Sequence, residues 1–162
     1  MKSSSTLKLS LASFVVILAF GGVAAANEDP KVAAEVIAIT KTQWAAEAAG
    51  RPVPDQMSIA ADDYTEFNGD FAVRVDTKAV NVKFGELALK DGGKQLASEM
   101  ANAKVQVYGD TAILSYTFLG VSQAKDGKIK NRTSKSTRVY TKVGGAWKLV
   151  HAHFSPIVMP KD

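Results

Sequence analysis

The only two histidines of the chain lie two residues apart, as His151-Ala-His153. On a strand both rings would point to one side and could reach a common metal ion. The chain has no cysteine, so a carboxylate such as Asp63, Glu66 or Asp110 would have to complete a zinc site. We therefore predict no metal site, and expect the histidines to hydrogen-bond across a sheet or at a dimer interface. A bulge that shifted the strand would instead turn them inward, where a histidine could act as a general base.

Three carboxylates form a second candidate group, Asp62, Asp63 and Glu66, where a short helix is expected to meet the first strand. An isomerase or a dehydratase needs such a base in an apolar pocket, with Tyr64 or Tyr116 as a donor to the substrate oxygen. Acids beside a tyrosine at a helix end also arise from capping and solvation. The catalytic role of these residues is left open, and we expect a non-catalytic protein.

The first 26 residues have the pattern of a secretory signal peptide. Lys2 and Lys8 precede an uncharged apolar run, residues 9–20, and three alanines end at Ala26, the expected cleavage site. The alternative is a retained membrane anchor, for which the apolar run is barely long enough. We expect an exported protein, in a bacterial periplasm or outside the cell, with no membrane contact after cleavage.

Composition narrows the possible functions of the remaining chain, residues 27–162. Loss of the two signal-peptide lysines lowers the formal charge from +4 to +2, which gives no case for nucleic-acid binding. The absence of cysteine excludes disulfides and thiol catalysis. The length suits one domain with its own core. We expect no cofactor.

Helices are expected in the first half. Asp29 and Pro30 suit the start of a long helix, and residues 50–54 end it with two prolines. A short helix over 55–61 and a third over 78–89 should follow. The long helix carries one apolar stripe: Val32, Val36, Ile37, Trp44 and Ala48.

Strands are expected in the second half. Asn68-Gly69 between residues 64–67 and 71–75 predicts a tight hairpin, and residues 94–102 are ambiguous between a helix end and a loop. Later strands are expected over 105–108, 112–121, 133–143 and 146–154. The pattern predicts an α+β domain with an antiparallel sheet.

Several motifs give the chain a family resemblance. They are Tyr108-Gly-Asp-Thr-Ala-Ile-Leu-Ser-Tyr116, Arg132-Thr-Ser134, Thr137-Arg-Val-Tyr140 and Gly145-Ala-Trp-Lys-Leu-Val-His-Ala-His-Phe-Ser155. The sequence resembles the nuclear transport factor 2-like (SnoaL-like, cystatin-like) superfamily, above all the association-domain branch of calcium/calmodulin-dependent protein kinase II. The resemblance implies a cone-shaped curved antiparallel sheet wrapped around the long N-terminal helix. It also implies homodimers through the outer sheet face, and rings of dimers in the kinase branch.

The same resemblance implies a pocket inside the cone, which association domains line with arginines. Arg138 matches one of these positions, whereas Phe118 and Phe154 stand at the other two. Tyr116, Tyr140 and Trp44 complete the expected lining. Such a pocket would take a small, partly apolar ligand with an anionic or carbonyl end. Alternatively, the two phenylalanines fill a core and Arg138 pairs with an acid.

Strand alternation supports the same inner face. It groups Ala112, Leu114, Tyr116 and Phe118, then Val150, Ala152 and Phe154, then Ser134, Ser136, Arg138 and Tyr140. The two histidines fall on the opposite face. We therefore expect an exported, non-catalytic pocket protein that binds a small ligand, self-associates, or both. The alternatives are a pocket enzyme and a protein-binding module that acts through the outer face.

Overall fold

The computed structural model describes residues 28–90 and 92–158, so the predicted signal peptide lies outside the described residues. The elements are α1 (Pro30–Ala48), α2 (Val53–Gln56), the 3-10 turn η1 (Met57–Ile59), β1 (Ala60–Phe67), β2 (Val75–Asp76), α3 (Lys78–Lys90), β3 (Lys94–Tyr108), β4 (Thr111–Gln123), β5 (Ile129–Val143) and β6 (Ala146–Pro156). Within the described ranges no helix is both long and apolar enough to cross a membrane.

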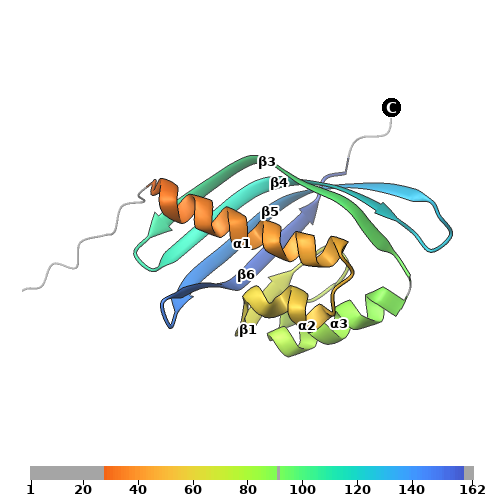
Figure 1. The fold of residues 1–162 in the computed structure, drawn as a ribbon, viewed down its shortest axis with the longest axis horizontal. Helices are drawn as coiled ribbons and strands as arrows, with labels where there is room; N and C mark the ends of the chain where they lie inside the picture. The colour runs from red at the N-terminus through yellow and green to blue at the C-terminus, as the bar shows by residue number, and fades with distance from the viewer. Residues whose placement is uncertain (1–27, 91, 159–162) are drawn as a thin grey trace, which may run out of the picture.

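The strands form one sheet in the order β2-β1-β6-β5-β4-β3. Neighbours are antiparallel except β1 and β6, which run parallel. The sheet is curved, and α1 crosses one of its faces, while α2 and α3 gather beside the C-terminal end of α1 (Figure 1). The predicted α+β fold, a curved sheet around a long N-terminal helix, is confirmed.

The start of α1 follows the predicted chemistry. The Asp29 carboxylate accepts hydrogen bonds from the backbone amides of Lys31 and Val32, at 2.9 and 3.2 Å. Pro30 occupies the first turn, where its missing N–H costs nothing. Most of the predicted stripe packs on the sheet, with Val36 and Trp44 buried and Val32 and Ile37 partly buried, but Ala48 is exposed.

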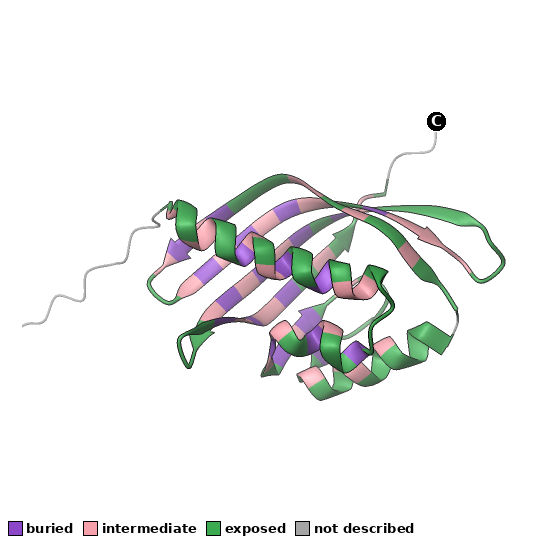
Figure 2. Cartoon of the chain, viewed as in Figure 1, coloured by how far each residue is buried: buried purple, intermediate pink, exposed green. Residues whose placement is uncertain are grey.

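The core lies between α1 and the sheet, where buried residues alternate along the strands (Figure 2). Ala112 and Leu114 are fully buried and Tyr116 nearly so, which confirms the inner face predicted for β4. The outer face of the same strand carries Thr111, Ile113 and Ser115, which are only half-buried.

The predicted tight hairpin at Asn68-Gly69 is wrong. β1 and β2 do pair, but only through Thr65 with Asp76 and Glu66 with Val75, so a loop of seven residues joins them. The asparagine side chain accepts a bond from the Asp70 amide, which turns the chain locally without setting strand register.

Two other boundaries differ from the predictions. Residues 94–102, expected as a helix end or loop, belong to β3 and pair with β4 from Lys94 onward. The short second helix begins earlier than expected, at Val53, because a proline is tolerated in a first helical turn; it ends before β1 starts at Ala60.

A bulge in β6 corrects one inner-face assignment. Tyr140 pairs with Leu149 and Val139 with His151, so Val150 has no partner on β5. Leu149 therefore takes the buried position beside Ala152 that alternation gave to Val150. Phe154 keeps its predicted face, because the bulge precedes it.

Candidate functional site

An inner cavity of about 340 Å³ opens between α1, α2, α3 and the inner face of the sheet. α1 lines it from above, β1 and the loop after it form one side, and β4, β5 and β6 form the floor. The lining residues that carry its chemistry are Gln43, Glu47, Glu66, Phe118, Arg138 and Phe154.

Arg138 is the buried cation of this cavity, with 5% of its surface exposed. Its Nε donates to the Tyr116 hydroxyl at 3.0 Å, and its Nη1 donates to Oε1 of Gln43 at 2.6 Å. Nη2 has no hydrogen bond to any described residue. The sequence left open that Arg138 pairs with an acid. Within residues 28–90 and 92–158 Arg138 forms no ion pair, and its hydrogen-bond partners, Tyr116 and Gln43, are neutral.

The guanidinium keeps its charge in this setting. Burial alone would lower the pKa of Arg138, but the surrounding phenols of Tyr116, Tyr140 and Tyr64 hold that pKa above its ordinary value. A buried charge without an ionic partner is costly in free energy. The cavity therefore offers a fixed positive charge that favours an electron-rich group beside it.

Aromatic rings form the apolar part of the cavity. The Arg138 guanidinium carbon lies 5.3 Å from the centre of the Phe154 ring, within cation–π range. Trp44 contacts Phe118 edge-on, with ring centres 5.4 Å apart. The structure thus brings together four of the predicted pocket residues, Arg138, Phe118, Phe154 and Trp44.

Tyr116 and Tyr140 lie outside the cavity lining. Tyr116 stands behind Arg138 and accepts its hydrogen bond. Tyr140 is fully buried deeper under α1, where its hydroxyl is 2.8 Å from the Thr40 hydroxyl. Both residues position the neighbouring core.

Of the three candidate carboxylates, only Glu66 reaches the cavity. It is 9% exposed, and its oxygens accept hydrogen bonds from the Tyr64 hydroxyl at 2.6 Å and from the Asn68 amide. Burial, together with Glu66, raises the pKa of the Tyr64 phenol, so this phenol remains a donor.

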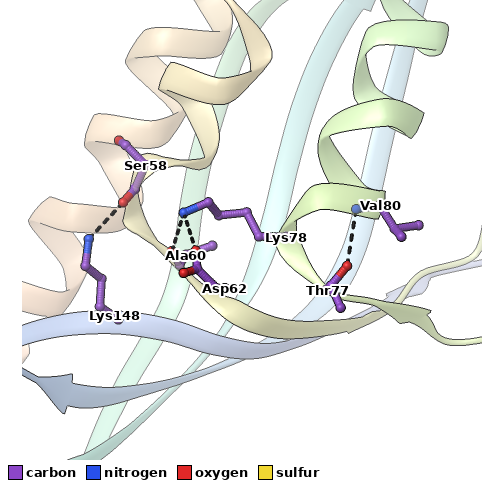
Figure 3. A network of polar contacts seen from close by, with 7 residues as sticks. All are labelled: Ser58, Ala60, Asp62, Thr77, Lys78, Val80 and Lys148. Carbon is purple, nitrogen blue, oxygen red and sulfur yellow. Dashed lines mark hydrogen bonds and ion pairs between the residues drawn. The ribbon is translucent and has the colours of Figure 1, made fainter.

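Asp62 and Asp63 point to solvent. Asp62 pairs with Lys78 of α3 at 3.0 Å, and the same ammonium group approaches the Ala60 carbonyl (Figure 3). This ion pair ties the start of α3 to β1 at the molecular surface. Asp63 is exposed on the same strand, so the structure separates both residues from the buried Glu66.

Glu47 is a cavity residue that sequence reasoning did not single out. Its carboxyl group is half-buried and accepts no hydrogen bond from the described residues. Burial raises the pKa of Glu47, the Arg138 charge acts in the opposite direction, and Glu66 raises it further. The available signal was spacing, because Glu47 follows Gln43 and Trp44 by four and three residues on the same helix face.

The two histidines lie on the outer face, as alternation predicts. His151 pairs with Val139 and His153 with Thr137, and both rings lie near Phe67. Nδ1 of His151 is 2.8 Å from the Thr65 hydroxyl of the adjacent strand, which confirms the expected cross-sheet hydrogen bond. Across the described ranges, no three His, Asp or Glu side chains are arranged to hold a metal ion.

A sequence model of the calcium/calmodulin dependent protein kinase II (CaMKII) association domain matches residues 32–158, from the first turns of α1 to the end of β6. The chain belongs to this family. The match covers the described helices and strands except the first two residues of α1, and it includes all residues that line the cavity. No curated protein matches the chain.

Solved structures agree with this membership of the association-domain family. The CaMKII hub homology domain of Chlamydomonas reinhardtii is 25% identical, with a TM-score of 0.64, over 78% of this chain and 98% of that one. The CaMKII hub of S. rosetta is 27% identical, with a TM-score of 0.63, over 76% and 95%. A nuclear transport factor 2-like protein of Pseudomonas putida, 21% identical with a TM-score of 0.68 over 80% and 89%, shares the fold.

Proposed function

We propose that the inner cavity binds a small, partly apolar molecule whose carboxylate or carbonyl group lies against Arg138. The observation that supports this most directly is a buried guanidinium whose hydrogen bonds to described residues, Tyr116 and Gln43, are all with neutral groups. An anionic group beside it would gain charge-assisted hydrogen bonds, which are roughly twice as strong as neutral ones.

The rest of the cavity sets the size and polarity of this ligand. A volume of about 340 Å³ suits a small organic molecule. Phe118, Phe154 and Trp44 offer ring faces and edges, so a flat or apolar body would pack beside the polar anchor. A purely polar anion such as phosphate would leave these rings uncovered.

Isothermal titration calorimetry with benzoate and its neutral analogue benzamide tests this proposal. We expect benzoate to bind, and Arg138→Gln to weaken it by roughly tenfold or more, the effect of losing a charged hydrogen bond. Arg74→Gln removes an exposed arginine outside the cavity and should change nothing. Because Arg138→Gln could disturb folding, its circular dichroism is compared with that of the wild type. Absence of binding by both compounds would contradict the proposal.

We further propose that copies of the chain associate through the outer sheet face. Membership of the association-domain family supports this, as do the two similar hub domains. Ile113, Val139 and His151 lie side by side across β4, β5 and β6 on that face, half-buried in the single chain. In a two-fold symmetric dimer, these three side chains can pack against the same three side chains of a second copy.

Light scattering after size-exclusion chromatography tests self-association. The wild type should elute as a dimer or larger assembly, and Ile113→Glu should reduce its mass by placing a charge in the interface. Ile129→Glu, at an exposed position near the β4–β5 turn, is the matched control and should leave the mass unchanged. A strictly monomeric wild type would argue against this role and leave the outer face to a different protein.

Export remains a proposal of its own, because residues 1–26 lie outside the described range. It is supported by the charge, apolar run and alanine cluster of that segment. N-terminal sequencing of protein recovered from a periplasmic fraction should begin at Asn27. Full-length protein in the cytoplasm would contradict it.

A further inference from the structure

Among the ionisable side chains that line the inner cavity, Arg138, Glu66 and Glu47 carry this inference. Their surroundings are unequal. Both carboxylate oxygens of Glu66 already accept hydrogen bonds, one from the Tyr64 hydroxyl and the other from the Asn68 amide. Glu47 has no hydrogen-bond donor among the described residues, and its position on α1 holds it half out of solvent.

We propose that Glu47 takes up a proton when a carboxylate binds beside Arg138, so that ligand affinity rises as pH falls. This inference rests on the proposed function, and it concerns the regulation of that same site. The proton comes from solvent and converts one carboxylate to a carboxylic acid, with no covalent step. The acid could then donate a hydrogen bond to the ligand.

The charge balance of the cavity drives this uptake. Apart from the Asp70–Arg132 ion pair, the free cavity holds one cation and two acids, and a bound carboxylate would add a further negative charge in this partly buried region. Like charges within a few ångströms favour the neutral form of one of them. Glu47 is the acid with a free place for the proton, because it accepts no hydrogen bond from the described residues, whereas both oxygens of Glu66 are already acceptors.

In the free protein, the surroundings of Glu47 already raise its pKa. Burial raises the pKa of Glu47, and the charge of Glu66 adds to the effect, while Arg138 opposes both. A ligand carboxylate bound to Arg138 would cancel much of that opposing influence. The pKa of Glu47 should therefore rise again on binding, which is the condition for net proton uptake.

Other charged groups near Glu47 have smaller parts in this balance. Asp70 and Arg132 line the cavity as a mutual ion pair at 3.1 Å, so their charges largely cancel. Lys94 of β3 borders an adjoining hollow together with Glu47, but it is exposed and therefore screened by solvent. Tyr64 is neutral, since burial raises its pKa.

Calorimetry with benzoate in two buffers of different ionisation enthalpy, at the same pH, counts the protons taken up. We expect a fraction of a proton per benzoate in the wild type near pH 7. The affinity should fall by up to about tenfold per pH unit at higher pH. Glu47→Gln should keep binding but lose both the proton uptake and the pH dependence, while Glu86→Gln, an exposed acid on α3, should keep both.

The outcomes separate this inference from the proposed function. Benzoate binding with no proton uptake overturns the role of Glu47 and leaves the ligand proposal standing, as does a Glu47→Gln variant that still takes up protons. Failure of the wild type to bind benzoate or benzamide at any pH overturns both. Binding of benzamide with the same proton uptake as benzoate overturns the role of Glu47, because an uncharged ligand adds no negative charge to the cavity.

Discussion

Nη1 of Arg138 on β5 lies 2.6 Å from Oε1 of Gln43 on α1, although 95 residues separate them in the sequence. This bond joins the long helix to the sheet at the cavity. It also supplies the buried guanidinium with a neutral acceptor where a carboxylate would have neutralised it. The side chain at position 43 therefore decides how much positive charge the cavity presents.

Gln43→Glu should convert this contact into an internal ion pair. We expect a fold of equal or greater stability and a loss of benzoate affinity of roughly tenfold, because the new carboxylate competes with the ligand for Arg138. Calorimetry measures the affinity and urea denaturation the stability. Gln106→Glu on β3, whose partner Ile113 lies on the outer face, is the control. Unchanged benzoate binding in Gln43→Glu would place the ligand elsewhere.

Leu114→Ala should destabilise the core without touching the cavity directly. Leu114 is fully buried under α1, and removal of a buried leucine costs about 2–5 kcal/mol in the free energy of unfolding. Leu119, on the same strand, is 38% exposed, so Leu119→Ala should cost much less. Urea denaturation of both variants makes the comparison, and equal losses would mean that β4 does not present the predicted inner face.

Much of the fold was predictable because local patterns and packing agree. Alternation along residues 112–118 selects Ala112, Leu114, Tyr116 and Phe118, and the structure buries the first three and half-buries Phe118. Residues 94–102 escaped prediction because they are rich in Ala, Glu, Met and Lys, which favour helix. Pairing with β4 overrides that preference, and it involves residues 16 to 29 positions away.

The candidate site was predictable only in part, for a similar reason. Alternation within β5 and β6 places Arg138 and Phe154 on the inner face, and both line the cavity. The contacts of Arg138 with Gln43, and the approach of Glu47, depend on how α1 crosses the sheet. Spacing along α1 groups Glu47 with Gln43 and Trp44, but it does not show which strands that helix face meets, so the approach of Glu47 to Arg138 was found only in the structure.

His151 should make stability depend on pH. Burial lowers the pKa of His151, with the nearby charges of His153 and Arg74 acting in the same direction. The unfolded chain then binds more protons than the folded one, so stability is lost as pH falls from about 7 toward 5. His151→Asn should flatten this slope in urea denaturation, whereas His153→Asn should largely retain it.

The wild-type curve alone cannot test this prediction, because Glu47 contributes with the opposite sign. Its raised pKa means that the folded chain binds the extra proton, which adds stability as pH falls. The difference between the wild type and His151→Asn removes that contribution. A difference that does not change between about pH 7 and pH 5 would contradict the prediction.

Gly120→Ala should narrow the cavity through Phe118. A Cβ at this position would lie 2.5 Å from Cε1 and 2.7 Å from Cζ of the Phe118 ring, distances that real side chains do not tolerate. Because the ring lines the cavity, we expect it to shift into that space. We expect benzoate affinity to fall by about tenfold, with an overpacking cost of about 1–3 kcal/mol in stability.

Gly93→Ala, whose added Cβ would meet no atom closer than 3.7 Å, is the control and should change neither quantity. Full affinity in Gly120→Ala would show that the ligand does not contact Phe118.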